Sequence, residues 1–235
     1  MRTTSIRLFV EAPLAKGATL TLPAAQAHYL TNVMRLAPGD GLRLFDGTAG
    51  EFQAVVEDIS RREIRLQVGA QTRLHQLEPD CWLCFALLKR QKTDLVVEKA
   101  TELGVCVIQP VITARTQADH VNLTRLRAIA VEAAEQCERL SVPEIRPPVA
   151  LAKLLENWPR HRALCVADER RTAPLLGAAQ GASALLVGPE GGFTDAELDG
   201  IGNAPLVTRV SLGRRILRAE TAVIAGLALM LAAAP

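Results

Sequence analysis

The sequence predicts an α/β protein in two parts: a β-rich N-terminal barrel and a C-terminal domain with a mostly parallel sheet. Three observations support this prediction. Residues 1–73 contain short apolar runs at regular spacing, which is typical of a small barrel. From Cys81 onward, apolar runs of strand length alternate with segments of helical length, which favours a parallel sheet with helices on both faces. A polar stretch at residues 71–80 separates the two patterns.

The N-terminal part is expected to contain four strands and one helix. The strands are predicted at residues 6–10, 41–47, 51–56 and 63–68. The helix is predicted to start around Pro23, because proline suits the first helical turn. Its apolar stripe, at helical spacing, consists of Ala27, Leu30, Val33 and Met34.

The C-terminal part is expected to alternate strands with helices. Strands are predicted at residues 82–88, 105–112, 163–167, 184–188 and 206–212. Helices are predicted at residues 92–103, 120–140, 194–202 and 219–233. A chain of 235 residues can form two small domains, and the polar stretch places them at residues 1–73 and 74–235.

The charge balance does not by itself predict a nucleic-acid partner. The net charge is only +2, so any nucleic-acid site has to be a local cluster of basic side chains. Aromatic residues make up 3% of the chain, which excludes binding that depends mainly on stacked aromatic platforms. Arginine would have to replace them, and 22 of the 27 basic residues are arginines. A general compositional bias toward arginine explains that number equally well.

The five cysteines indicate buried free thiols in a reducing cytoplasm, because their number is odd and their spacing is scattered. Cys81 and Cys84 lie three residues apart on a predicted strand, so they point to opposite faces and cannot share a metal ion. We expect no metal site. The apolar run at residues 222–234 is shorter than the ~20 residues that span a bilayer, so we expect a cytoplasmic protein that does not enter a membrane.

Two glycine-punctuated segments are the strongest functional signal. In residues 185–193 and 211–222 an apolar run stops at a glycine, and a segment able to form a helix follows. Glycine lets the backbone approach a ligand where a side chain would collide. Two such turns at the ends of neighbouring parallel strands would form a ligand cleft. The spacing matches neither a P-loop nor a Rossmann turn, and two ordinary tight turns remain the simpler alternative.

Taken together, the two segments resemble the last two loops of the knotted methyltransferases of the SPOUT superfamily. Within that superfamily the sequence most resembles the RsmE family, which methylates uridine N3 in small-subunit ribosomal RNA. Three further blocks add to this resemblance, at residues 28–40, 91–105 and 132–145. In the last block Glu138 occupies a position where the family usually has glycine.

The resemblance implies a PUA-like RNA-binding barrel at residues 1–73 and a SPOUT methyltransferase domain with a deep trefoil knot at residues 74–235. It also implies a homodimer, S-adenosylmethionine as methyl donor, and 16S ribosomal RNA of the small ribosomal subunit as partner. Two alternatives stay open: a non-catalytic RNA-binding or ribosome-assembly module with the same fold, and a knotted methyltransferase that acts on another RNA atom such as the ribose 2′-hydroxyl.

The resemblance also implies roles for individual residues. The residues expected to bind the donor are Thr113, Val187, Gly188, Pro189, Glu190, Gly191, Gly192, Leu212, Gly213, Ile216 and Leu217. The residues expected to act in catalysis are Arg218, which would stabilise negative charge on the uracil, and Glu220, which would act as general base. The residues expected to bind RNA are His28, Arg35, Gln136 and Arg139.

Several of these residues also have purely structural explanations. Glu220 would lie in the first turn of the last helix, where an acid complements the helix dipole. For Glu190 the alternative is a functional one: its carboxylate could face the sulfonium or the ribose of the donor. Glu132, Gln136 and Arg139 would share one helical face, which a solvated surface ladder explains as well as an RNA-facing wall does.

Overall fold

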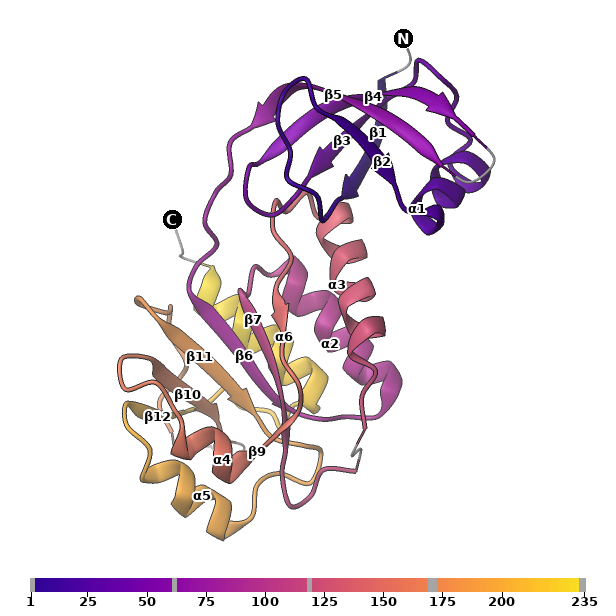
Figure 1. Cartoon of the computed structure of the whole chain (residues 1–235). Helices are drawn as coiled ribbons and strands as arrows, with labels where there is room; N and C mark the ends of the chain where they lie inside the picture. Colours follow the sequence, from indigo (N-terminus) through magenta and orange to yellow (C-terminus); the bar gives the residue numbers. More distant parts are fainter. Residues whose placement is uncertain (1–2, 61–62, 118–119, 169–172, 233–235) are drawn as a thin grey trace. The chain divides into compact units, whose positions relative to one another are not determined.

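The computed structural model describes residues 3–60, 63–117, 120–168 and 173–232, and the chain forms two compact units (Figure 1). The first unit consists of Met1–Leu77 and Ala134–Ser141. The second consists of Glu78–Ala133 and Val142–Pro235. A short segment from the middle of the chain therefore belongs to the N-terminal unit.

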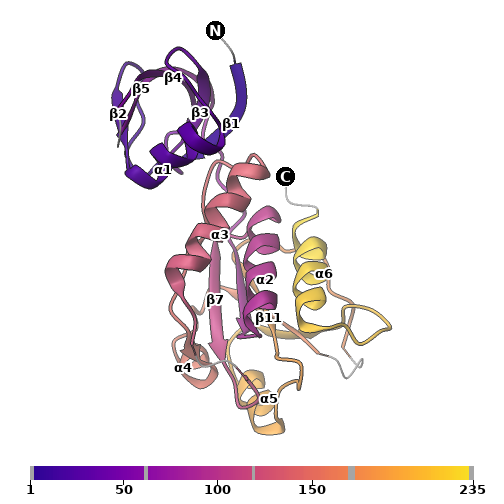
Figure 2. The same cartoon turned by 90° about the vertical axis from the view of Figure 1, so that its right-hand side faces the viewer.

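A five-stranded sheet in the order β1-β3-β4-β5-β2 builds the first unit. Its strands are β1 (Thr3–Phe9), β2 (Thr19–Leu22), β3 (Gly41–Phe45), β4 (Glu51–Ile59) and β5 (Ile64–Arg73). Among its described strands, β1 and β3 pair in parallel and the other pairs are antiparallel. Figure 2 shows the sheet curling around its interior, with α1 (Ala24–His28) beside it. The four predicted strands are confirmed, whereas β2, with only four residues, was not predicted.

The predicted helix is correct in place but wrong in detail. α1 has Pro23 at its N-cap position instead of in its first turn, and it continues directly into a π-helix, η1 (Tyr29–Val33). A π-helix turns less per residue than an α-helix, so it breaks the spacing assumed for the apolar stripe. Ala27 and Leu30 are buried as expected, but the side chains of Val33 and Met34 are exposed.

Arg7 on β1 holds the segment Ala134–Ser141 within the first unit. Its guanidinium donates hydrogen bonds to the carbonyl oxygens of Ala134 (3.1 Å), Glu135 (2.9 Å) and Arg139 (3.0 Å). Its Nε also donates to the Glu51 Oε2 atom at 2.8 Å, and both side chains are buried. The last carbonyls of a helix have no partner within the helix, so a buried arginine is a suitable cap for them.

A sheet in the order β12-β10-β11-β6-β7-β8 forms the second unit, and its described strands all pair in parallel. Its strands are β6 (Cys81–Ala86), β7 (Val107–Ile112), β8 (Glu144–Ile145), β10 (Ala163–Ala167), β11 (Ser183–Val187) and β12 (Val207–Val210), and β9 (Val149–Ala150) pairs with β7 outside this order. The five predicted strands are confirmed. The two-residue strands β8 and β9 were not predicted.

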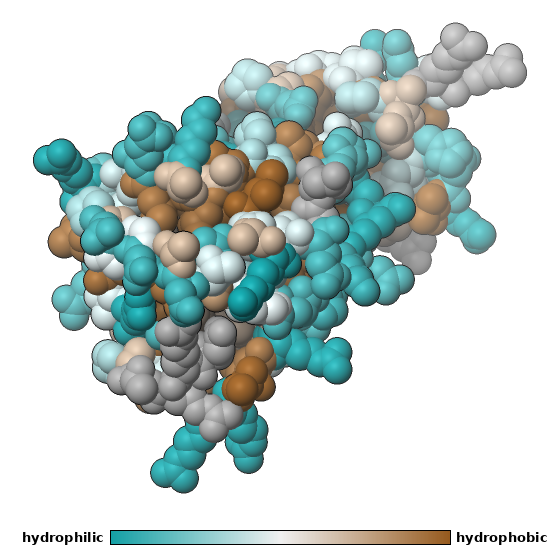
Figure 3. Space-filling model, turned by 90° about the horizontal axis from the view of Figure 1, so that it is seen from below, coloured by the Kyte–Doolittle hydropathy of each residue, from teal (hydrophilic) through white to brown (hydrophobic). Residues whose placement is uncertain are grey.

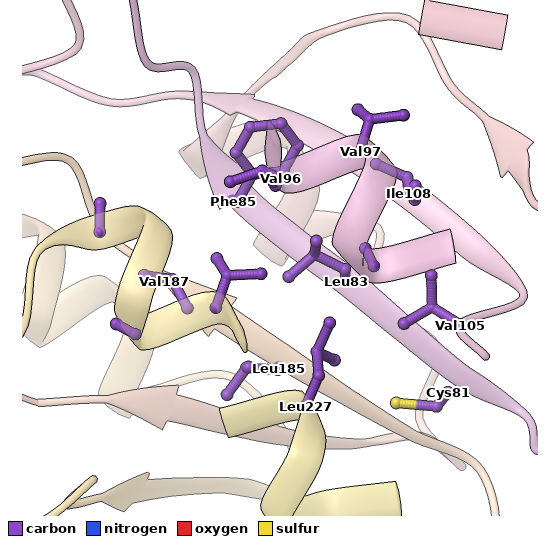
Figure 4. Close-up of a cluster of buried hydrophobic side chains, with 14 of the residues drawn as sticks. Cys81, Leu83, Phe85, Val96, Val97, Val105, Ile108, Leu185, Val187 and Leu227 are labelled. Atoms are coloured by element: carbon purple, nitrogen blue, oxygen red, sulfur yellow. The ribbon is translucent and has the colours of Figure 1, made fainter. Parts of the chain in front are cut away.

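Helices cover both faces of this sheet, as the alternating pattern predicts. The helices are α2 (Arg90–Glu102), α3 (Leu123–Gln136), α4 (Leu151–Glu156), α5 (Asp195–Gly202) and α6 (Ala219–Leu231). One buried cluster joins α2, α3 and α6 to the sheet, and a second joins α4 and α5 to its other face. Figure 4 shows Leu83 and Leu185 from the strands packing against Leu227 of α6.

Two predicted helix ends differ from the structure. The helix predicted at residues 120–140 ends at Gln136, because Glu138 has a left-handed backbone (φ 62°) that a helix cannot contain. The last helix ends at Leu231, and residue 233 lies outside the described residues. α4, which has only six residues, was not predicted.

Cys81 and Cys84 are both fully buried on β6, in clusters on opposite faces of the sheet. Burial raises the pKa of both thiols to about 12, so both are protonated at neutral pH. In the described part of the chain, no three His, Cys, Asp or Glu side chains gather as a metal site requires. Every helix described here is too short or too polar to span a lipid bilayer.

Candidate functional site

A cavity of about 420 Å³ lies at the carboxyl ends of β10, β11 and β12. Its lining consists of Ala167, Asp168, Val187, Gly188, Pro189, Glu190, Gly191, Gly192, Ser211, Leu212, Gly213, Arg215, Ile216, Leu217, Arg218, Ala219 and Ala222. Figure 3 views the molecule from the lower end of Figure 1, toward which the strands of the second unit run. It shows apolar side chains gathered among hydrophilic ones. Both glycine-punctuated segments therefore line one cavity.

The two strands that lead into these segments are not neighbours, which corrects the sequence-based expectation. β10 pairs with β11 on one side and with β12 on the other. The end of β10 thus lies between the two loops, and Ala167 and Asp168 contribute to the cavity wall. The cleft is as expected, but three strands instead of two supply it.

Glycine is required for backbone reasons at two positions of these loops. Gly192 (φ 67°) and Gly213 (φ 116°) have left-handed backbones that other residues rarely adopt. Gly188 is confined for a different reason, because a Cβ atom there would lie 3.0 Å from the ring of Phe193. The conformation of both loops therefore depends on glycine.

Lys92, in the first turn of α2, connects the first loop with the start of α6. Its Nζ atom lies 2.9 Å from the Glu190 Oε1 atom and 3.4 Å from the Glu220 Oε2 atom. The hydrogen bond from Lys92 holds the pKa of the Glu190 carboxyl below its usual value. The same pairing raises the pKa of Lys92, so the lysine is charged at neutral pH. Glu190 is therefore directed toward a cation of the protein.

Arg218 and Glu220, the two predicted catalytic residues, lie at the beginning of α6. Arg218 is the N-cap residue, is exposed and lines the cavity. Glu220 lies in the first helical turn and is not a lining residue, and its ion pair with Lys92 directs one carboxylate oxygen toward α2. The structure thus places the Arg218 cation in the cavity wall and the Glu220 carboxylate in the following helical turn, outside that wall.

Thr113 is buried in a turn beside the first loop and does not line the cavity. Its backbone N–H donates to the Thr116 Oγ1 atom (2.8 Å). In the same turn, Arg115 donates a hydrogen bond to the Gly191 carbonyl oxygen, and its side chain lies against the position of a Gly191 Cβ atom. The turn therefore supports the loop through Arg115, a residue that was not predicted.

The four predicted RNA-binding residues lie in different surroundings. His28 and Arg35 are exposed in the first unit, and Arg35 has a left-handed backbone (φ 57°). Gln136 is exposed at the end of α3. Arg139 is buried and its Nε donates to the Ser141 Oγ atom (3.1 Å). The prediction that Arg139 shares a helical face with Gln136 is therefore wrong. The left-handed residue Glu138 separates the two.

Sequence reasoning missed Asp168 and did not predict a role for Lys92. Asp168 directly follows a strand that was predicted, but no glycine marks the end of that strand as it does the other two. In the sequence, Lys92 stands out only as part of the family block at residues 91–105. Its contacts with Glu190 and Glu220 join residues 98 and 128 positions apart, which no local pattern reveals.

Comparison with known proteins places the chain in a family. Residues 75–231 match the family described as RNA methyltransferase domain, and residues 22–69 match the RNA methyltransferase PUA domain. The ribosomal RNA small subunit methyltransferase E of Rickettsia conorii is 34% identical over 227 residues, which cover 94% of this chain and 93% of that protein. The chain belongs to the ribosomal RNA small subunit methyltransferase E family. It is therefore an RNA methyltransferase with an N-terminal PUA domain.

Other members of the family agree over most of their length. The Synechocystis protein of the same name is 37% identical over 92% of this chain and 74% of that protein. The Neisseria gonorrhoeae ribosomal RNA small subunit methyltransferase E, solved with bound S-adenosylmethionine, is 30% identical with a TM-score of 0.87 and covers 95% of both chains. A Legionella pneumophila protein, solved with the same cofactor bound, is 29% identical with a TM-score of 0.89, and the match covers 98% of both chains.

Proposed function

We propose that this chain transfers a methyl group from S-adenosylmethionine to N3 of a uridine in 16S ribosomal RNA of the small ribosomal subunit. The supporting observation is the cavity at the carboxyl ends of β10, β11 and β12, which two glycine-dependent loops line. The solved family member from Neisseria gonorrhoeae binds S-adenosylmethionine, and the curated relatives are named for methylation of small-subunit ribosomal RNA.

The cavity suits a donor that is part apolar and part charged. Its volume of about 420 Å³ falls within the usual range of small-molecule sites, about 300–1,000 Å³. Val187, Leu212 and Leu217 give it apolar walls, and the backbone at Gly188–Gly192 can recognise adenine by N–H and C=O groups. We therefore propose that the lining residues named from the sequence hold the donor, with Thr113 supporting them from its turn.

The reaction is an in-line displacement at a methyl carbon. The bound donor supplies an electrophilic methyl group on a sulfonium: transfer breaks the sulfur–carbon bond, forms a bond to uracil N3 and leaves a neutral thioether, while the N3 proton goes to a base. The protein's task is to hold both partners in line, which in the best intramolecular cases is worth about 7–11 kcal/mol.

We propose that Arg218 stabilises the charge that develops on the uracil and that Glu220 accepts the N3 proton. Removal of the N3 proton leaves negative charge on the uracil carbonyl oxygens, and Arg218 lines the cavity with a cation able to stabilise it. Glu220 would accept the proton. One of its oxygens lies 3.4 Å from the Lys92 Nζ atom, at the start of the helix that follows Arg218.

The RNA is proposed to lie on the exposed residues His28, Arg35 and Gln136. We leave Arg139 out of this surface because its side chain is buried. We further propose that the first unit is a PUA-like barrel, that the second contains the deep trefoil knot, and that two copies form a homodimer in the cytoplasm. The likeness to the Neisseria gonorrhoeae protein over 95% of both chains supports the proposed fold.

A methylation assay with nucleoside analysis tests the proposed function. Purified protein is incubated with small ribosomal subunits or their RNA, lacking the modification, and with donor labelled in its methyl group. The proposal predicts label in 3-methyluridine. Label in a 2′-O-methylated nucleoside would replace the proposed target atom, and RNA binding without any methyl transfer would replace the enzyme with a binding module.

A further inference from the structure

We infer that Asp168 binds a positively charged group of the methyl donor. The inference rests on the proposed function, because it concerns the ligand of the same cavity. Asp168 lines that cavity, and its carboxylate would act as a counter-ion for either the sulfonium or the ammonium group of the donor.

Asp168 has a fixed and central position. It follows β10, the strand between β11 and β12, and so lies between the two strand ends that lead into the loops. Its backbone N–H donates to the Val210 carbonyl oxygen at 2.9 Å, which continues the ladder between β10 and β12 by one residue. The carboxylate is therefore attached to the end of the sheet, a rigid element, instead of to a long loop.

The two acids in the described cavity wall differ in exposure. Glu190 is on the exposed side of the first loop, where its carboxylate accepts a 2.9 Å hydrogen bond from Lys92. Asp168 has only 9% of its surface exposed. A buried carboxylate interacts more strongly with a nearby charge than an exposed one, because the surrounding medium screens less.

The donor requires such a partner. S-adenosylmethionine has positive charge at its sulfonium and at its amino group, and burying an uncompensated charge in an apolar cavity is costly. After methyl transfer the sulfur is neutral while the ammonium remains. A carboxylate next to the sulfur would therefore favour the donor over the product, whereas one next to the ammonium would bind both equally.

Calorimetric titration of the full-length Asp168→Asn variant tests the inference with three ligands. These are S-adenosylmethionine, S-adenosylhomocysteine, which lacks the sulfonium, and 5′-methylthioadenosine, which lacks both charged groups. We expect Asp168→Asn to weaken the binding of S-adenosylmethionine about tenfold to a hundredfold, the usual effect of losing a hydrogen bond to a charged group. The affinity for 5′-methylthioadenosine should change less than threefold.

The affinities for S-adenosylmethionine and S-adenosylhomocysteine together show which charged group of the donor Asp168 contacts. Loss for S-adenosylmethionine alone assigns Asp168 to the sulfonium, and equal loss for S-adenosylhomocysteine assigns it to the ammonium. Equal loss for all three ligands, or no loss for any, overturns the inference. Wild-type protein that binds none of the three would instead contradict the proposed function.

Two further variants complete the experiment. Asp199→Asn removes an exposed acid from α5, outside the cavity lining, and should leave all three affinities unchanged. If Asp168→Asn does not fold, Asp168→Glu is titrated in its place, since it keeps the charge but displaces it by one methylene. A larger loss for the charged ligands than for 5′-methylthioadenosine supports the inference, and an equal loss overturns it.

Discussion

At the scale of single residues, Glu138 has a backbone conformation that residues other than glycine rarely adopt. It follows α3 in the left-handed region (φ 62°), which glycine adopts at no steric cost. Its carbonyl accepts a hydrogen bond from Arg73 Nη1 (2.9 Å), and its carboxylate lies 3.8 Å from the same atom in an exposed ion pair. The backbone contact does not require a side chain, and an exposed ion pair contributes little.

We therefore expect Glu138→Gly to stabilise the protein by about 0.5–1 kcal/mol. The left-handed strain of a non-glycine residue is about 1–2 kcal/mol, and the added backbone entropy of glycine offsets about 0.5–1 kcal/mol of it. Urea unfolding followed by circular dichroism measures the change. Glu138→Gln, which keeps the Cβ atom, should bring no gain, and an equal gain there would show that charge and not backbone is responsible.

Arg218 is the residue whose proposed role differs most from simple donor binding. Arg218→Ala should lower kcat about a hundredfold, in the range seen when one stabilising donor is removed from a developing negative charge. The affinity for S-adenosylmethionine, measured by calorimetry, should change less than threefold. Arg214→Ala is the matched control, because Arg214 is exposed in the same loop but does not line the cavity. A normal kcat for Arg218→Ala would remove it from the mechanism.

At the scale of elements, Lys92 couples three of them: α2, the loop after β11, and α6. Lys92→Met should weaken donor binding about threefold to tenfold, the combined effect of two partly exposed ion pairs. The pKa of the Glu190 carboxyl, now held low by Lys92, should rise. Lys92→Arg should restore most of the affinity in the same titration. Unchanged binding by Lys92→Met would show that the loop keeps its shape without the lysine.

The buried pair of Arg7 and Glu51 joins β1, β4 and the end of α3. Burial alone would raise the pKa of Glu51, but hydrogen bonds from Arg7 and Thr72 outweigh it and hold the pKa below the usual 4.5. A lowered pKa means that the pair's contribution is complete above pH 4.5 and is lost as the pH falls through the folded-state value.

Glu51→Gln should accordingly destabilise the first unit by about 3–5 kcal/mol at pH 7, because it leaves Arg7 buried without its counter-ion. The difference from wild type should shrink as the pH is lowered below 4.5. Denaturant unfolding of both proteins from pH 7 to pH 3 measures it. A difference that is the same at every pH would mean that lost packing, and not the ion pair, causes the destabilisation.

Elements with a strong local pattern could be predicted from the sequence. The nine strands and helices expected from Cys81 onward all exist, because each has a long apolar run or a clear helical period. The elements that were missed, β2, β8, β9 and α4, have two to six residues and too short a pattern to detect. The π-helix at Tyr29–Val33 could not be predicted, because it changes the spacing on which the helical pattern depends.

The loops of the candidate site could be predicted because their backbone conformation requires glycine. Gly192 and Gly213 appear in the sequence as glycines after apolar runs and lie where the loops line the cavity. Lys92 and Asp168 could not be connected to the site in this way. Their positions depend on the packing of α2 and on the order of the strands, which place β10 between β11 and β12.

At the scale of the whole molecule, the chain consists of two units that are not continuous in sequence. The proposed boundary between residues 73 and 74 separates the two sheets, but Ala134–Ser141 belongs to the first unit. A fragment beginning at residue 74 would lack Arg7, which binds three carbonyl groups of that segment. The full chain is therefore the right material for measurements of binding and activity.

We propose that the cavity at the ends of β10, β11 and β12 holds S-adenosylmethionine. Calorimetric titration of the full-length protein with S-adenosylmethionine tests this proposal. We expect saturable binding with one site per chain. Absence of binding by protein that circular dichroism shows to be folded, with small-subunit ribosomal RNA also present, would contradict it.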